Sequence, residues 1–180
     1  GVDHEFSTIP GVREDIIEVI ANLKKIRFKL FSDDPVTLQL SASGIGEATA
    51  KNISARADIE VVNPEQHVAT MTDKKTELEI EIRVEKGVGY VPVEQRQKEK
   101  LSVGEIAIDG IFTPIRNVHF EVENIRVGQR TDYNKVLIDI ETDGSITPEE
   151  TLKKASQILL DHFQIINTVI VPEAIEKPAK

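Results

Sequence analysis

The sequence predicts an α+β fold with a mainly antiparallel sheet and one helix near each end of the chain. Short extended patterns follow one another with turn signals between them, and two helical patterns flank them. An apolar content of 39% and a charged content of 29% are typical of a folded globular protein. Because aromatic residues make up only 4%, the core must depend on Ile, Val and Leu.

A helical pattern begins shortly after the start of the chain. Apolar residues recur there at spacings of three and four, which places them on one helix face. They are Val12, Ile16, Val19, Ile20 and Leu23. Glu14 and Asp15 are expected in the first turn and Lys24 and Lys25 in the last, where their charges match the helix dipole. We therefore predict a helix here.

Extended patterns occupy the middle of the chain. Residues 26–31 and 36–40 alternate and are separated by the turn signal SDDP, and the small-residue segment 41–53 (SASGIGEATAKNI) is expected to be a loop with a short helical turn. Further strands are predicted at 58–62, 67–71, 77–84, 103–109, 118–127 and 135–142. Residues 77–84 give the clearest pattern, because apolar and charged residues alternate there without a break.

A second helix is predicted near the C-terminal end. Thr147 suits the N-cap, Pro148 the first helical position, and Glu149 and Glu150 the first turn. An apolar stripe follows, made of Leu152, Ala155, Leu159, Phe163 and Ile166 and widened by Ile158 and Ile165. A stripe this broad indicates burial against more than one surface, and therefore a protein interface.

Composition excludes several classes of function. The absence of Cys excludes disulfides, thiol nucleophiles and Cys-based zinc sites. A net charge of −9 makes the chain a poor candidate for direct DNA or RNA contact, which depends on Lys and Arg. We find no signal peptide and no apolar run near the roughly 20 residues of a membrane helix. The chain begins without Met and ends in EAIEKPAK, which reads as a linker, so we expect a piece of a longer polypeptide.

The sequence predicts no catalytic, cofactor or metal site. The four histidines lack metal-ligand spacing, and the glycines of KGVGY and SGIGEATA fail the phosphate-binding patterns. Paired carboxylates have ordinary explanations in turns and on solvated strand faces, and no nucleophile elbow occurs. An interface protein is the leading interpretation. A stand-alone ligand-binding or hydrolytic α+β domain with a site not visible in the sequence is the alternative.

Six segments, in this order, resemble one known family. They are GVDHEFSTIPGVREDIIEVIANLK, SGIGEATAKNI, NPEQHVATMTD, KGVGYVPVEQR, IAIDGIFTPIRNVHFEVENIR and the adjoining VGQRTDYNKVLIDIETDGSITPEETLKKASQIL. Together they cover roughly residues 1–166, and they resemble the N-terminal domain of the bacterial RNA polymerase alpha subunit. The Gly-Tyr-x-Pro turn, VGQRTDYNKV and the TDGSITPEE helix start are the most specific of them.

The resemblance implies a non-catalytic subunit of a nucleotidyltransferase, DNA-directed RNA polymerase, in the bacterial cytoplasm and associated with the nucleoid. In this family the domain forms a homodimer on which the beta and beta-prime subunits assemble. Residues 1–116 would be the inserted subdomain, 117–168 part of the dimerisation subdomain, and 169–180 a linker. The stripe from Leu152 to Ile166 would then pack in the dimer interface.

Three positions carry over as candidates for contact with the large subunits. Lys24 and Ile108 match family positions linked to beta-prime assembly, and Glu18 is a weaker candidate on the same helix. Ile108 can equally be a core strand residue. Compared with the family, the opening strands and an Arg-rich helix of the dimerisation subdomain are absent, as is the DNA-binding C-terminal domain. Dimerisation is therefore in question for this piece, and direct DNA contact is not expected.

Overall fold

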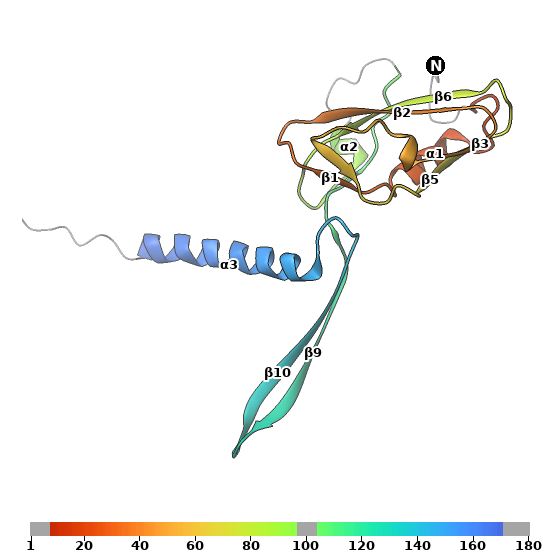
Figure 1. The fold of residues 1–180 in the computed structure, drawn as a ribbon. Helices are drawn as coiled ribbons and strands as arrows, with labels where there is room; N and C mark the ends of the chain where they lie inside the picture. The colour runs from red at the N-terminus through yellow and green to blue at the C-terminus, as the bar shows by residue number, and fades with distance from the viewer. Residues whose placement is uncertain (1–7, 97–103, 171–180) are drawn as a thin grey trace, which may run out of the picture. The chain divides into compact units, whose positions relative to one another are not determined.

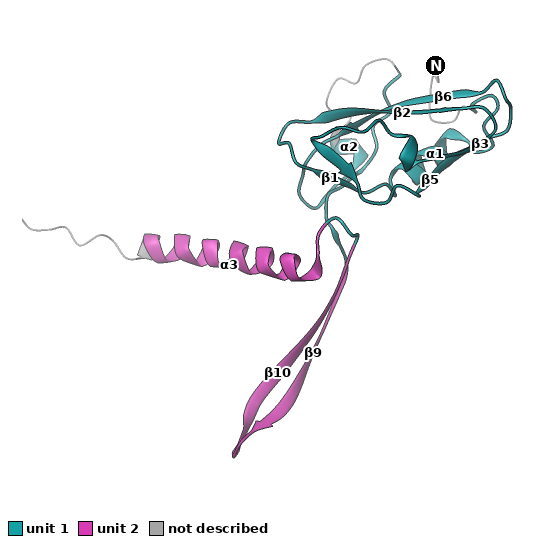
Figure 2. Ribbon diagram, viewed as in Figure 1, with its two compact units in different colours: residues 1–116, 143–145 teal, residues 117–142, 146–180 magenta. Residues whose placement is uncertain are grey.

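The computed structural model describes residues 8–96 and 104–170 and has an α+β fold in which most strand pairs are antiparallel (Figure 1). The predicted fold class is confirmed. The chain divides into two compact units, coloured separately in Figure 2. Unit 1 comprises residues 1–116 and 143–145, and unit 2 comprises residues 117–142 and 146–180.

Unit 1 contains short strands that pair antiparallel. Its described elements are α1 (Ile16–Leu23), β1 (Phe28–Leu30), β2 (Val36–Ser43), β3 (Gly46–Thr49), η1 (Ala50–Asn52), β4 (Ile59–Val61), β5 (His67–Met71), β6 (Glu77–Val84), β7 (Tyr90–Val91), α2 (Val93–Arg96) and β8 (Gly110–Ile111). Strand β1 pairs with β4, β2 with β6, β3 with β5, and β7 with β8. Leu38 and Leu40 of β2 and Val68 of β5 are fully buried at the centre of the core, which Val19 of α1 also joins.

Helix α1 begins later than its periodicity predicts. Asp15 is the N-cap, and its Oδ1 accepts a hydrogen bond from the Glu18 backbone at 2.7 Å. The preceding residues form a turn and a bend beside the end of β5, where Val12 bridges to Met71 and the Arg13 N–H donates to the Thr70 carbonyl at 2.9 Å. The prediction that Glu14 lies in the first helical turn is therefore wrong. Hydrogen bonding to β5 competes successfully with the helical pattern there.

The small-residue segment 41–53 is more ordered than predicted. Strand β2 continues to Ser43, a turn at Gly44 follows with φ of +83°, and β3 and η1 complete the segment. The exposed fraction of Ala48 is 0% and that of Ala50 is 1%. Small side chains are used here because the backbone is closely packed against the core, and not because the chain forms a loose loop.

One strand prediction requires correction. Residues 104–109, the described part of the predicted strand 103–109, are neither helical nor extended in a ladder, and β8 begins only at Gly110. The strands at 28–30 and 36–43, on either side of SDDP, each pair with a more distant strand. The strand at 77–84 agrees with its prediction residue for residue.

Unit 2 consists of a hairpin and a long helix. Its described elements are β9 (Ile115–Val127, of which the first two residues belong to unit 1), β10 (Arg130–Thr142) and α3 (Pro148–Ile170). The hairpin turns at Gly128, with φ of +64°, so β10 begins earlier than the predicted residue 135. At the start of α3, Thr147 Oγ1 accepts from the Glu150 N–H at 3.2 Å and Glu150 Oε2 accepts from the Thr147 N–H at 3.3 Å. This reciprocal cap confirms the predicted helix start.

Candidate protein interface

The side chain of Lys24 forms an ion pair with Asp109, which lies 85 residues further along the chain. Lys24 caps the C-terminal end of α1, where its backbone N–H donates to the Ile20 carbonyl at 3.0 Å. Its Nζ lies 2.7 Å from Asp109 Oδ2, and the two side chains are 30% and 23% exposed. Asp109 Oδ1 accepts a hydrogen bond from the Val93 N–H at 3.0 Å. One carboxylate therefore connects the end of α1 with the start of α2.

Groups of the same chain stabilise the charge of this carboxylate. The pKa of Asp109 lies below its ordinary value, mainly because of the hydrogen bond from Lys24 and then because of the one from the Val93 backbone. The Tyr90 side chain supplies a further hydrogen bond. A carboxylate held by several donors stays ionised, so the ion pair is maintained at neutral pH.

The structure places the three predicted large-subunit residues in two locations. Ile108 is half-buried and immediately precedes Asp109, so it lies in the neighbourhood of Lys24. Glu18 is exposed and lines a shallow hollow together with His67. Six residues along a helix correspond to a rotation of about 600°, so Glu18 points about 120° away from Lys24 around the axis of α1. The structure does not bring Glu18 to the ion pair.

Apolar side chains are exposed on β7 and β8 and in the turn before them. Val88 is 91% exposed, Tyr90 59% and Ile111 42%, and Tyr90 faces Ile111 across the strand pair. Gly87 precedes them, and a Cβ at this position would lie 2.5 Å from the Phe112 ring. The lack of a side chain at Gly87 therefore allows the Phe112 ring to pack against this turn. Exposed apolar groups beside a half-buried ion pair are typical of a protein contact surface.

Sequence reasoning did not single out Asp109 or Val88, and it noted Tyr90 only within the Gly-Tyr-x-Pro turn. The signal for Val88 was present, because a branched apolar residue between two glycines has no sequence neighbour against which to pack. For Asp109 there was no comparable signal. Its partner is distant in sequence, and motif spacing carries no information about such a pair.

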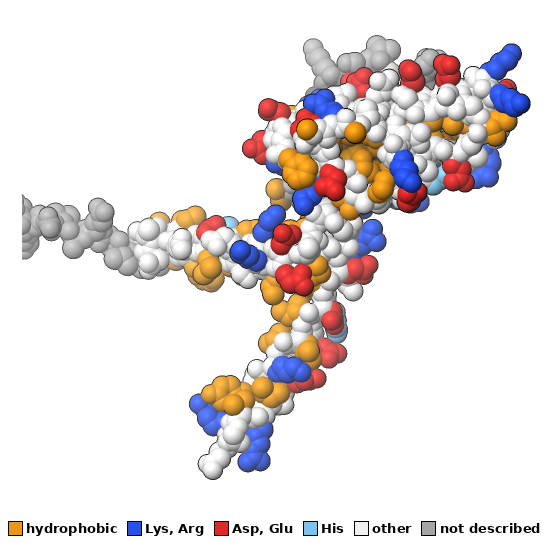
Figure 3. Space-filling view, in the orientation of Figure 1, with side chains coloured by type: hydrophobic (Ala, Val, Ile, Leu, Met, Phe, Trp, Pro, Cys, Tyr) orange, Lys and Arg blue, Asp and Glu red, His pale blue; other side chains and the backbone are white. Residues whose placement is uncertain are grey.

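The apolar stripe of α3 is exposed along its length. Its predicted members are Leu152, Ala155, Leu159, Phe163 and Ile166, and each of them is accessible to solvent. Phe163 is 66% exposed and Leu159 61%. Alternate residues of β9, namely Val118, Phe120 and Val122, add exposed apolar groups, and Figure 3 shows hydrophobic side chains along both α3 and the hairpin. No side chain in the described part of unit 2 is buried, so this unit has a large unpaired apolar surface.

The shallow hollow beside Glu18 contains one carboxylate with a strongly shifted pKa. Glu14 is buried and accepts hydrogen bonds from the Thr70 N–H at 2.6 Å, the Thr70 hydroxyl at 2.8 Å and His67 Nε2 at 3.1 Å. Burial opposes ionisation, but these donors outweigh it and lower the pKa of Glu14 to about 2. A carboxylate with this pKa is a very weak general base at neutral pH. Its contacts instead hold the chain before α1 against β5.

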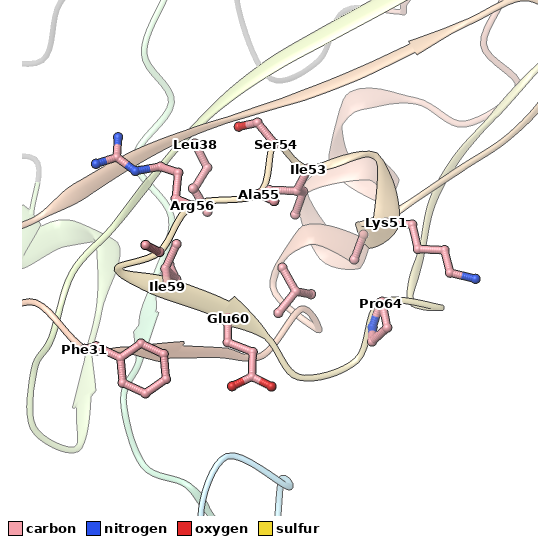
Figure 4. A pocket seen from close by; sticks show the side chains of 13 residues that line it. Phe31, Leu38, Lys51, Ile53, Ser54, Ala55, Arg56, Ile59, Glu60 and Pro64 are labelled. Atoms are coloured by element: carbon pink, nitrogen blue, oxygen red, sulfur yellow. The ribbon is translucent and has the colours of Figure 1, made fainter.

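A second hollow, of about 470 Å³, lies between β2, β4 and the segment after η1 (Figure 4). Its walls are mostly apolar, with Leu38, Ile53 and Ile59 among them. Two basic residues stand at its rim, and each has an acidic partner within the chain. Lys51 pairs with Glu65 at 2.5 Å, and Arg56 binds both carboxylate oxygens of Asp58 at 2.9 and 2.8 Å. Glu60 adds one exposed carboxylate to the lining. A single carboxylate is not the convergent set of polar groups that the alternative, a ligand-binding or hydrolytic site, requires.

Residues 8–96 and 104–170 contain no group of three His, Cys, Asp or Glu side chains that could hold a metal ion. Every helix in these ranges is too short or too polar to cross a bilayer.

Comparison with known proteins identifies the family. Residues 1–113 match the family model described as RNA polymerase Rpb3/RpoA insert domain. The DNA-directed RNA polymerase subunit alpha of Salinibacter ruber is 50% identical over 163 residues, which cover 90% of this chain and 49% of that protein. The corresponding subunit of Chlorobium phaeobacteroides is 50% identical over 164 residues, or 91% and 50% of the two chains.

A more distant relative gives the same result. The subunit alpha of Alkaliphilus oremlandii is 44% identical over 169 residues, which are 94% of this chain and 53% of that protein. The chain thus spans about half the length of the curated relatives it matches. The resemblance seen in the six sequence segments is confirmed. The chain belongs to the RNA polymerase Rpb3/RpoA insert-domain family and, along nine-tenths of its length, is similar to DNA-directed RNA polymerase alpha subunits.

Proposed function

We propose that this chain is the assembly part of the alpha subunit of a bacterial DNA-directed RNA polymerase. It forms a homodimer, and the dimer is the platform on which the beta and beta-prime subunits assemble for DNA-templated transcription in the cytoplasm, where the enzyme associates with the nucleoid. The chain supplies no catalytic group and makes no direct contact with DNA. The observation that carries the proposal is the large exposed apolar surface of unit 2 in a chain of this family.

The dimer contact is the stripe of α3. Burying one large apolar side chain contributes about 1.5–3 kcal/mol, so four of them contribute about 6–12 kcal/mol. Association costs an estimated 4–15 kcal/mol in lost freedom of motion. One stripe alone is therefore a marginal interface. In a symmetric dimer both copies contribute the same stripe, and the balance becomes favourable.

Unit 1 carries the surface for the large subunits, at Lys24, Ile108 and Glu18. On this proposal, residues 1–116 are the inserted subdomain, 117–168 belong to the dimerisation subdomain, and 169–180 form a linker. Support comes from the exposed apolar residues beside the Lys24–Asp109 ion pair and from the compactness of unit 1 as a body with its own core.

Affinity purification of the tagged full-length protein from its source cells tests the proposal. We expect the beta and beta-prime subunits to co-purify, and light scattering of the purified protein to give the mass of a dimer or a larger assembly. If the protein never travels with the large subunits, the proposed function is wrong.

A matched pair of variants tests the dimer contact. Leu159→Asp places a charge in the stripe, whereas Gln164→Asp places the same charge about 140° away around α3. The first should raise the dimer dissociation constant by at least a hundredfold, and the second should change it by less than threefold, because only the first buries a charge. Equal effects of the two variants would contradict the assignment of the stripe.

A further inference from the structure

We infer that Lys24 acts on the large-subunit surface through Asp109, as a positioning residue for the segment 104–111, and does not offer a free cation to the partner. The inference rests on the proposed function and deepens it. Residue matching alone would place Lys24 in direct contact with a large subunit. The geometry points to a contact within the chain instead.

The charge of Lys24 is already satisfied inside unit 1. Its Nζ lies 2.7 Å from Asp109 Oδ2, which is the short distance of a charge-assisted hydrogen bond. Both side chains are less than one-third exposed, so solvent screens the pair only in part. A partner carboxylate would therefore meet a cation whose charge Asp109 already largely neutralises, and replacing Asp109 would leave a partly buried carboxylate without its cation, which is costly.

Asp109 is bound on more than one side. Its Oδ2 accepts from Lys24 Nζ at 2.7 Å, and its Oδ1 accepts from the Val93 backbone at 3.0 Å. The carboxylate therefore joins two elements, namely the end of α1 and the start of α2. A residue with this connectivity fixes the path of its own backbone.

The segment that Asp109 fixes has little regular structure of its own. Residues 104–109 belong to no helix or ladder, and β8 pairs with β7 through only two residues on each strand. Ile108 precedes Asp109, and the exposed Tyr90 and Ile111 face each other across the strand pair. Loosening the ion pair would therefore displace the apolar groups that form the proposed contact surface.

A double-mutant cycle distinguishes the two roles of Lys24. The full-length protein is prepared as Lys24→Met, Asp109→Asn and the double variant. Asp109→Asn keeps an acceptor for the Val93 N–H while removing the charge. Lys24→Arg keeps the ion pair, and Lys25→Met removes a neighbouring exposed cation whose Nζ donates to Asn22 Oδ1 at 3.3 Å. These last two serve as rescue and control.

Two readouts are needed. Amide hydrogen exchange of residues 104–111 in the protein alone should become about three- to tenfold faster than in the wild type in both single variants. The double variant should exchange at the same rate as the single variants, because either substitution alone already breaks the ion pair. The dissociation constant for the beta-prime subunit should rise by a similar factor in all three. Lys24→Arg and Lys25→Met should behave as the wild type in both measurements.

Three results would decide against the inference or the proposal. Unchanged exchange in the single variants would show that the ion pair does not hold the segment. Losses of affinity that multiply in the double variant would show that Lys24 contacts the partner directly. If the wild type binds no large subunit, the proposed function fails, and exchange at 104–111 still decides whether Lys24 positions that segment.

Discussion

Replacing Glu14 with Gln should remove one acid-sensitive contribution to the stability of unit 1. Glu14 is buried beside β5, and its carboxylate accepts two hydrogen bonds from Thr70 and one from His67. Arg13 Nη2 also lies 3.4 Å from Glu14 Oε1. Gln has nearly the same shape, but it carries no charge and presents an NH₂ group where Glu14 presents a second acceptor. The substitution therefore tests the charge with little change in packing.

The size of the effect follows from the pKa of Glu14. Burial raises this pKa, but the hydrogen bonds from Thr70 and His67 outweigh burial and lower it from 4.5 to about 2. A difference of this size between the folded and unfolded states corresponds to about 3 kcal/mol of unfolding free energy at neutral pH. Because the folded-state pKa is the lower one, the contribution is complete above about pH 4.5 and is lost as the pH falls towards 2.

Urea unfolding at pH 7, 4 and 2.5, followed by circular dichroism, measures the effect. The Glu14→Gln variant should be about 2–3 kcal/mol less stable than the wild type at pH 7, and the difference should shrink as the pH falls. Glu18→Gln is the control, because Glu18 is an exposed carboxylate beside the same hollow, and it should change stability by less than about 0.5 kcal/mol. Equal stability of Glu14→Gln and wild type at pH 7, or a difference that does not depend on pH, would refute the reasoning.

Two further predictions concern the backbone. Gly11→Ala places a Cβ 1.9 Å from Thr76 Oγ1 at a φ of +78°, whereas Gly44→Ala has the same kind of φ, +83°, and no atom within 4 Å. Urea unfolding should therefore show a loss of about 1–2 kcal/mol for Gly44→Ala and several kcal/mol more for Gly11→Ala, and equal losses would show that the contact with Thr76 relaxes freely. Thr147→Ala removes the N-cap of α3 and should cost about 1 kcal/mol, seen as faster amide exchange in the first turn; unchanged exchange would mean that Glu150 alone suffices as a cap.

Local patterns predicted the elements whose signals are local. The start of α3 was predictable because the capping residues Thr147 and Glu150 are three positions apart. Strand β6 was predictable because its faces alternate within eight residues. The pairing of β1 with β4 and of β2 with β6 was not predictable, because strand partners are chosen by the core as a whole and not by the nearest turn signal.

The candidate site shows the same division. Lys24 and Ile108 were found through family resemblance, and no chemical motif indicated either of them. Asp109 was missed because an ion pair between positions 24 and 109 leaves no trace in sequence spacing. Glu14 was assigned to a helix turn because its charge suits a helix N-terminus, but three donors near β5 bind it more strongly.

The two units differ in how much apolar surface they bury, and this difference is not visible to a search for catalytic, cofactor or metal motifs. Unit 1 has its own core, with Leu38, Leu40 and Val68 fully buried. Unit 2 has one hairpin and one helix, and no side chain in its described part is buried. An isolated two-stranded hairpin is marginally stable, and an isolated helix gains most of its stability from packing of its apolar face. The conformational entropy of ordering unit 2 must therefore be offset by burial of its apolar surface. On the proposed function, the folding of unit 2 and its association are one equilibrium. The apolar stripe of α3 is the feature of this association that sequence periodicity reveals.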